Sequence, residues 1–229
     1  MSHHHCSERR GIPKGTSELY GHDMLLQTEV IKRIRNVYQR MGFDELRTPT
    51  LEFAETFDGY HGEGEDLLFH LKDKQLHNLV LRYDLTVPLA RFIGDHPELP
   101  IPFKRYQIEK VFRDDKPDKG HYREFIQCDG DIVGVDSLSA DADIVNVAYQ
   151  GFKAINIPNG KIRLNHRLIL KGITEKLNLG KESTIKIQRT LDHIDKLKGS
   201  SLLEEINKQD LPQRVEPLLK KLIYLKGTT

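Results

Sequence analysis

The chain has 229 residues, with 35 Lys and Arg against 34 Asp and Glu, and a formal net charge of +1. This length allows one domain with an appendage, and the balanced charge excludes a general attraction to RNA, so that any RNA contact must be local. Two cysteines are too few for a disulfide framework, which favours a reducing compartment and a cytoplasmic location. The sequence contains no apolar run of membrane-spanning length, so we expect no association with a membrane.

The first half of the chain begins with a segment, residues 1–10, that we interpret as a disordered tail or the remnant of an expression tag. We assign no metal site to its three histidines. Apolar residues at helical spacing then predict an amphipathic helix from Met24 to Met41, ended by Gly42. Residues 43–53 read as a strand, in which Pro49 is expected near an edge or an irregularity because it has no N–H for the ladder. A helix followed by such a strand fits either a dimerisation face or a core helix with an edge strand.

Polar residues at alternating positions follow in two further segments. If LRYDLTVP, residues 81–88, is extended, Asp84 and Thr86 point the same way. Residues 103–134 predict a β-hairpin whose turn contains Pro117 and Gly120. Side chains two apart share one face of a strand, and in the second strand these are Arg123, Phe125, Gln127, Asp129 and Asp131. That face is either a solvated sheet surface with cross-strand ion pairs or a binding surface that Arg113 completes.

The remainder of the chain predicts helices. Asp141 and Asp143 precede an apolar-periodic stretch, and residues 161–170 read as a strand entering a helix, in which we expect no catalytic role for His166. Residues after Ser183 are lysine-rich and interrupted by glycine and proline, which predicts two or three short helices. The expected organisation is a partial main domain over residues 11–180 and a helical insertion region over 181–229. The expected fold class is α+β, an incomplete antiparallel β-sheet flanked by helices.

One set of residues in the hairpin resembles the second sequence motif of class II aminoacyl-tRNA synthetases. These residues are Phe112, Arg113, Asp115, His121, Phe125 and Asp129. Together with Gln127, Asp131 and LRYDLTVP, they resemble the histidyl-tRNA synthetase family in its archaeal and eukaryotic form. The segment GIPKGTSELYG resembles the opening of this family, except that Ser17 and Glu18 stand where Arg and Asp are usual.

The resemblance implies roles for these residues in joining histidine to ATP. Arg113 is implied as the catalytic cation that bridges the histidine carboxylate and the α-phosphate of ATP. The implied histidine-binding residues are Asp84, Thr86, Arg113, Gln127 and Asp131, with Asp131 facing the imidazole. The implied ATP-binding residues are Arg113, Asp115, His121, Arg123 and Phe125, with Phe125 facing the adenine. The implied substrates are histidine, ATP with Mg²⁺ and tRNA(His), the implied assembly is a homodimer, and no metal site or tightly bound cofactor is expected.

Departures from the family pattern leave other functions open. His121 stands where histidyl enzymes usually have Arg, which predicts weaker ATP binding. An RGLDYY-like string and the third class II motif do not occur in the sequence, so the resemblance covers about the first half of a synthetase and we expect no efficient aminoacylation from this chain alone. One alternative is a catalytically silent relative that serves as the regulatory subunit of ATP phosphoribosyltransferase in histidine biosynthesis. Another is an interaction module that keeps only the dimer scaffold.

Overall fold

The structure is a computed structural model that describes residues 11–58 and 65–164 together with residues 166, 168, 171, 172 and 175. The chain divides into two compact units, Met1–Ile162 and Arg163–Thr229, and all the elements below belong to the first. Three predictions lie outside the described residues: the tail over residues 1–10, the domain boundary at residue 180 and the short helices after residue 183.

The predicted amphipathic helix is confirmed as α1, Gly21–Arg40, which begins three residues before Met24. An acidic residue in its first turn and Arg40 in its last turn both suit the helix dipole. The helix ends where Gly42 adopts a φ of 75°, a left-handed conformation that glycine enters without a steric penalty.

The prediction of one strand over residues 43–53 is wrong. This segment forms two short strands, β1 (Asp44–Glu45) and β2 (Leu51–Phe53), which belong to different sheets. Pro49 lies in the break between them, as the expectation of an irregularity near that residue requires. Since proline lacks the N–H that a continuous ladder uses, the chain leaves the first sheet here and enters the second.

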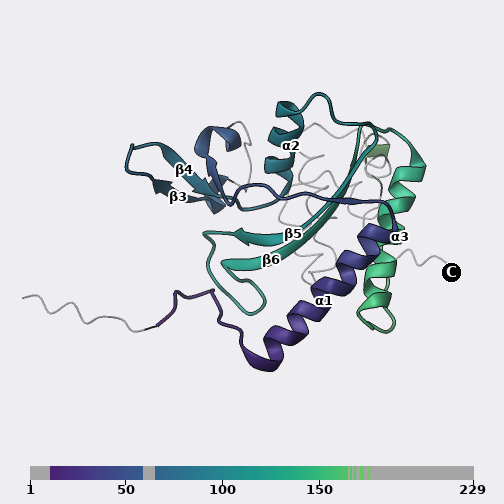
Figure 1. Cartoon of the computed structure of the whole chain (residues 1–229), viewed down its shortest axis with the longest axis horizontal. Helices are drawn as coiled ribbons and strands as arrows, with labels where there is room; N and C mark the ends of the chain where they lie inside the picture. The colour runs from purple at the N-terminus through teal and green to yellow at the C-terminus, as the bar shows by residue number, and fades with distance from the viewer. Residues whose placement is uncertain are drawn as a thin grey trace, which may run out of the picture. The chain divides into compact units, whose positions relative to one another are not determined.

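Two three-stranded sheets make up the β structure (Figure 1). In the first, β1 pairs parallel with β5 (Phe103–Phe112), and β5 pairs antiparallel with β6 (Glu124–Val133). In the second, β4 (Asn78–Leu81) lies between β2 and β3 (Phe69–Lys72), and both pairings are antiparallel. Two 3₁₀ turns, η1 (Ala54–Phe57) and η2 (Glu65–Leu67), lie between β2 and β3 in the chain. The α+β class is therefore confirmed.

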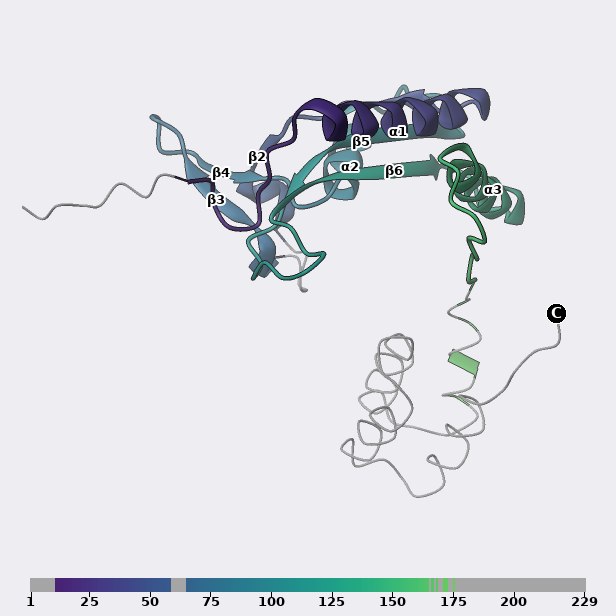
Figure 2. The same cartoon turned by 90° about the horizontal axis from the view of Figure 1, so that it is seen from below.

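The β5–β6 hairpin is confirmed, and different helices lie on its two faces. On one face, helices α1 and α3 (Leu138–Ala154) pack side by side against the hairpin (Figure 2). Their shared core contains Tyr38, Phe43, Tyr106 and Val147. The rings of Tyr38 and Tyr106 stack at 4.9 Å between centroids, which fixes α1 against the middle of β5. In Figure 1, α2 (Thr86–Asp95) and α1 lie on opposite sides of the hairpin.

The expectation that residues 81–88 are extended is wrong for their second half. Leu81 ends β4, and Thr86 is the first residue of α2. Two local features start this helix: Asp84 accepts a hydrogen bond from the backbone N–H of Val87 at 3.2 Å, and Pro88 sits in the first turn, where its missing N–H costs nothing. Val87 then enters a second core with Phe57, Leu68 and Val80, which attaches α2 to the smaller sheet.

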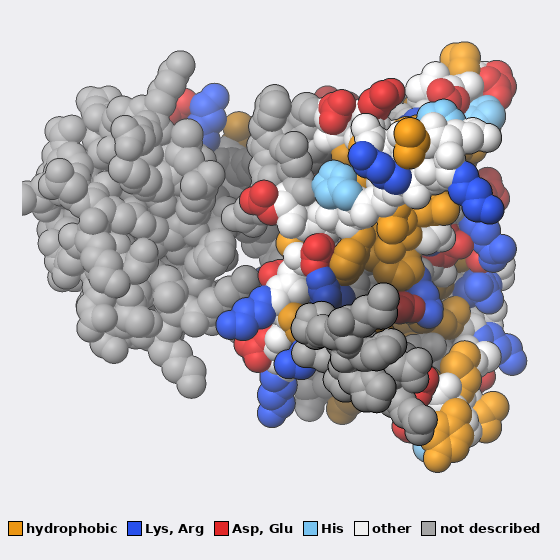
Figure 3. All heavy atoms as spheres, turned by 90° about the vertical axis from the view of Figure 1, so that its left-hand side faces the viewer, with side chains coloured by type: hydrophobic (Ala, Val, Ile, Leu, Met, Phe, Trp, Pro, Cys, Tyr) orange, Lys and Arg blue, Asp and Glu red, His pale blue; other side chains and the backbone are white. Residues whose placement is uncertain are grey.

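The distribution of charged side chains on the surface agrees with the nearly equal numbers of basic and acidic residues in the sequence. On the face in Figure 3, Lys and Arg side chains lie among Asp and Glu side chains around an apolar area. Across the part of the chain that the structure describes, every helix is too short or too polar to cross a bilayer.

Candidate active site

Arg113 follows β5 directly and lies against the segments that the sequence placed around it. Its Nε donates a hydrogen bond to the carbonyl of Tyr83 at 3.2 Å, and its Nη2 donates to Gln127 Oε1 at 3.4 Å. Its guanidinium carbon lies 5.0 Å from the ring centroid of Phe125, within the range of a cation–π contact. Arg113 is thus held at three points between the LRYDLTVP segment and β6.

A row of polar side chains continues from Arg113 along β6. The amide nitrogen of Gln127 donates to both carboxylate oxygens of Asp129, at 2.9 and 3.1 Å. The carbonyl oxygen of the same amide accepts from Arg113, so this side chain has a defined orientation between a cation and an anion. The alternation of the strand therefore brings Phe125, Gln127 and Asp129 to one face, as predicted.

Asp131, two residues further along β6, pairs with a cation from the opposite strand. The register sets it across from Arg105, and Nη2 of Arg105 lies 2.6 Å from its Oδ2. Burial raises the pKa of Asp131 above its ordinary value, the positive charge of Arg105 opposes this, and the neighbouring Asp129 adds to it. Asp131 keeps a third of its side chain exposed, which leaves its carboxylate accessible to a ligand.

Asp84 and Thr86 reach the same region from the start of α2. Burial raises the pKa of Asp84, the hydrogen bond from Val87 lowers it, and the charge of Asp129 raises it again. The positive charge of Arg113 also acts on Asp84. The helix start therefore brings Asp84 close to Arg113 and Asp129, although the extended geometry expected for this pair is absent.

A cavity of about 600 Å³ adjoins these residues. Thr86, Gln127, Asp129 and Asp131 supply its polar wall. Residues of α1 and α3, such as Tyr38 and Val147, supply the apolar wall. The cavity follows β6, which within the described residues is the outer strand of its sheet. Burial raises the pKa of Tyr38, so that its hydroxyl stays neutral beside the carboxylates.

The implied ATP-binding residues are only partly brought together. Arg113 and Phe125 are in contact, whereas Asp115 and His121 lie in the exposed loop between the strands. Asp115 accepts a hydrogen bond from the N–H of Lys116, and His121 forms a β-bridge with Asp118 across the loop. These contacts are local, and they do not connect the loop to Arg113.

Arg123 accepts a backbone hydrogen bond from Arg113 at 2.9 Å, but its side chain contacts other residues. Its side chain pairs with Asp114, and its guanidinium carbon lies 4.8 Å from the ring centroid of Phe69 in β3. Its backbone N–H donates to the carbonyl of Gly15 at 2.8 Å, so the segment that opens the described chain packs against the hairpin. Arg123 directly precedes β6, and its guanidinium lies over a ring of β3, so the shared face with Phe125 stays a prediction.

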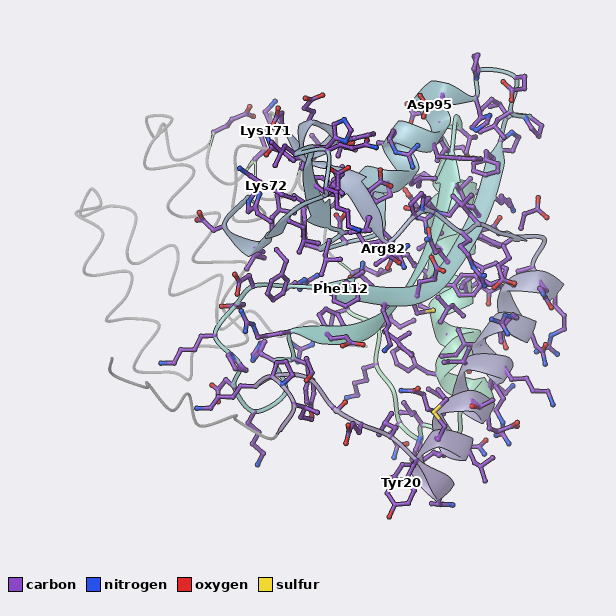
Figure 4. The ribbon with its side chains drawn as sticks, turned by 60° about the vertical axis from the view of Figure 1, so that its left-hand side comes forward. Tyr20, Lys72, Arg82, Asp95, Phe112 and Lys171 are labelled. Atoms are coloured by element: carbon purple, nitrogen blue, oxygen red, sulfur yellow. The ribbon has the colours of Figure 1, made fainter. Side chains whose placement is uncertain are left out.

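Sequence reasoning missed two buried arginines, Arg82 and Arg105. Arg82 donates from Nη1 to the carbonyl of Thr48 at 2.7 Å and to Glu109 at 2.9 Å, and from Nε to the carbonyl of Lys110 at 2.9 Å. Figure 4 shows it at the junction of the small sheet and the hairpin. A signal for Arg105 was present, because counting the hairpin register back from Asp131 sets Arg105 opposite that carboxylate. Within residues 11–58 and 65–164, the structure shows no group of three His, Cys, Asp or Glu side chains suited to a metal ion.

Comparison with solved structures defines the class of the protein. A histidyl-tRNA synthetase from Nostoc sp. PCC 7120 matches with a TM-score of 0.82 and 29% identity, over 96% of this chain and 49% of that chain. A protein from Bacillus halodurans C described as an ATP phosphoribosyltransferase regulatory subunit/histidyl-tRNA synthetase matches with a TM-score of 0.72 and 19% identity, over 94% and 63% of the two chains, and this likeness concerns the fold alone. The fold is that of a class II aminoacyl-tRNA synthetase.

Sequence comparison is more specific. The family model described as histidyl-tRNA synthetase matches residues 15–229. Histidine–tRNA ligases from Aeropyrum pernix and Korarchaeum cryptofilum are 38% and 37% identical to this chain, over 94% and 95% of its length. The chain belongs to the histidyl-tRNA synthetase family. It spans about half the length of these curated relatives, 50% and 51% respectively.

Proposed function

We propose that the chain supplies the substrate-binding face of a histidine–tRNA ligase. In this reaction a carboxylate oxygen of histidine attacks the α-phosphorus of ATP, the bond from that phosphorus to the pyrophosphate oxygen breaks, and pyrophosphate leaves. The histidyl group of the adenylate then passes to the 3′ end of tRNA(His), releasing AMP. Because this chain spans half the length of its relatives, the proposal concerns its share of the site.

The observation that carries the proposal is the position of Arg113. It lies between the carbonyl of Tyr83 and the side chains of Gln127 and Phe125, and its charge acts on Asp84. A guanidinium in this position can bind the histidine carboxylate and the α-phosphate together, which reduces their repulsion and stabilises charge at the phosphorus. The step needs no protein base, since the attacking carboxylate is already ionised, so the contribution of Arg113 is orientation and charge.

Carboxylates around Arg113 suit the cationic end and the ring of histidine. Asp84, Thr86 and Gln127 offer acceptors for the ammonium group, and Asp131 offers an acceptor for an imidazole N–H. Phe125 offers a ring face to adenine. In this proposal Asp115, His121 and Arg123 bind ATP, with its Mg²⁺ as part of the substrate, when the loop between β5 and β6 closes over the nucleotide.

The homodimer is also a proposal, and α1 supports it. The N-terminal part of this helix exposes Leu25 and Leu26, and Tyr20 is exposed directly before it. Apolar side chains gathered at one end of a helix are typical of a surface that a partner covers. We propose a second copy of the chain as that partner.

Equilibrium binding tests the proposal on the chain itself. We expect isothermal titration to detect both L-histidine and MgATP, and Arg113→Met to weaken each by about tenfold or more, because a bridging cation contributes to both anions. Arg40→Met, which removes an exposed cation at the end of α1, serves as the matched control and is expected to leave both affinities unchanged.

The same titrations separate the competing functions. Unchanged affinities in Arg113→Met would contradict the assignment of the bridge. Histidine binding without ATP binding, in the parent chain as in the variant, would favour a regulatory subunit of ATP phosphoribosyltransferase. Binding of neither ligand would favour an interaction module that keeps the dimer scaffold.

A further inference from the structure

Arg105 is a buried cation to which the proposed reaction assigns no role. Its side chain is 0% exposed, near the start of β5. Its Nη2 pairs with Asp131 at 2.6 Å and donates to the carbonyl of Leu85 at 3.3 Å, whereas its Nε and Nη1 are buried without a hydrogen-bond partner. Burying a guanidinium with two unpaired nitrogens is costly, and an apolar side chain of similar size would avoid this cost.

The two partners of Arg105 belong to different parts of the candidate site. Asp131 lies on β6, where the proposed function places the imidazole of histidine. Leu85 directly precedes Thr86, where the proposed function places the ammonium group. One guanidinium nitrogen, Nη2, therefore connects the two segments that would hold opposite ends of the same ligand.

We propose that Arg105 is a positioning residue that sets the spacing between Asp131 and the Leu85–Thr86 segment and keeps the Asp131 carboxylate ionised. The site then selects a ligand that carries both a ring N–H and an ammonium group. This inference rests on the proposed function and deepens it, because it identifies a residue that determines the preference for histidine over amino acids with rings of similar shape.

The charges around Asp131 explain why a buried cation is needed there. Asp129 faces it from the same strand, and the hydroxyl of Tyr38 approaches from α1. Asp136 and Asp141 line a second cavity with Asp131, on the side of α3. Arg105 is the cation that pairs with Asp131 against these negative charges, at 2.6 Å. Its removal leaves burial and neighbouring carboxylates to favour the protonated form of Asp131.

The first test follows the carboxyl carbon of Asp131 by NMR as a function of pH, with no ligand present. We expect Arg105→Met to raise the titration midpoint of Asp131 by about one pH unit or more. Lys104→Met is the matched control, because Lys104 is the adjacent residue, points to the opposite face of the sheet and pairs with Asp143 at 2.7 Å. It is expected to leave the midpoint of Asp131 unchanged.

The second test compares L-histidine with β-(2-thienyl)alanine, whose ring has a similar shape and no N–H. We expect Arg105→Met to weaken histidine binding by about tenfold and to leave thienylalanine and MgATP binding unchanged, because only histidine uses the acceptor. The pH at which histidine binding is half-maximal is also expected to rise. Both contacts of Arg105 are made by Nη2. Arg105→Lys retains the charge, but its shorter side chain does not place a nitrogen at the position of Nη2, so it is expected to keep the Asp131 midpoint and still lose part of the histidine preference.

These measurements separate the inference from the function on which it rests. A parent chain that binds no histidine would refute the proposed function, while the Asp131 titration still decides whether Arg105 keeps that carboxylate ionised. An unchanged midpoint in folded Arg105→Met overturns the inference. If that variant does not fold, Arg105→Lys decides, because a parental histidine preference in that variant also overturns it.

Discussion

Asp84 shows how a residue proposed to bind histidine can lower the stability of the fold that contains it. Burial raises its pKa, so the folded state favours the protonated carboxyl more than the unfolded state does. Below the ordinary pKa of Asp, both states are protonated and the residue has no effect on stability. As the pH rises from the ordinary pKa to the raised pKa, the unfolded state ionises first, which lowers the free energy of unfolding, and this loss persists at neutral pH.

Asp84→Asn is therefore expected to raise the free energy of unfolding at pH 7 and to have little effect at pH 3. The asparagine oxygen can still accept the hydrogen bond from Val87, so the start of α2 is retained. Urea unfolding at the two pH values measures the difference. The same variant is expected to lose histidine affinity, because it removes a charge from the proposed ammonium site. A gain at pH 3 equal to that at pH 7 would mean that ionisation is not the cause.

His121 tests the ATP side of the site. A guanidinium offers more donors and a permanent charge to a phosphate than an imidazole does, so His121→Arg is expected to tighten MgATP binding several-fold. The loop position of residue 121 is exposed, which leaves room for the longer side chain. Lys119→Arg, in the same loop, controls for a general increase in donors. Titration of MgATP at neutral pH decides, and the assignment fails if the arginine brings no gain.

Helices and strands with long periodic patterns could be predicted from the sequence, whereas the short strands could not. The period of α1 and the alternation of β6 extend over enough residues to fix the type of element. The β1–β2 segment was misread because its strands are two and three residues long and join different sheets, which is a tertiary outcome. The misreading of Thr86 was avoidable, since Asp84 and Pro88 are both signals for the start of a helix.

The same distinction applies to the candidate site. Residues of β6 are brought together by alternation alone, so Gln127, Asp129 and Asp131 could be placed from the sequence. The direction in which Arg123 turns depends on Asp114 and the ring of Phe69, which no local pattern reports. Assignment of ligands to these residues came from resemblance to a family, because a row of charges on a strand is equally typical of a solvated face.

The contact between α1 and β6 depends on the absence of a side chain at Gly130. A Cβ at this position would lie 2.4 Å from Cε1 of Tyr38, whose ring is already stacked on Tyr106. Gly130→Ala is therefore expected to lower the free energy of unfolding by about 1–3 kcal/mol, the usual cost of overpacking. Because the chain has no Trp, circular dichroism during urea unfolding is the suitable measurement.

Gly151→Ala gives the matched comparison within α3. A Cβ there meets no atom within 4 Å, and alanine is the better helix former, so this change is expected to add about 0.5–1 kcal/mol. Opposite signs for the two substitutions would locate the constraint at Tyr38. A neutral Gly130→Ala would show that the aromatic stack yields without cost, and α1 would then be less firmly fixed to the sheet than the contacts indicate.

At the scale of the whole described fold, Arg82 joins the two sheets on which the site depends. Its backbone N–H donates to Thr50 and its carbonyl accepts from Phe112, while its side chain reaches Thr48, Glu109 and Lys110. The Asp84 segment follows Arg82 directly, and Arg113 follows Phe112 directly. The relative position of these two site residues is therefore set by contacts made at Arg82.

Glu109 offers a sharp test because it pairs with two arginines of very different exposure. Arg82 is 2% exposed and lies 2.9 Å from one carboxylate oxygen, whereas Arg47 is 81% exposed and lies 3.2 Å from the other. Arg82→Met is expected to cost about 3–5 kcal/mol of unfolding free energy, because it removes the buried cation that pairs with Glu109 and the side-chain donor to three carbonyls. Arg47→Met is expected to cost less than about 1 kcal/mol, as is usual for exposed pairs. Urea unfolding measures both losses. Similar losses in the two variants would mean that the buried arginine contributes only its charge. The link between the sheets would then have to come from the apolar cores.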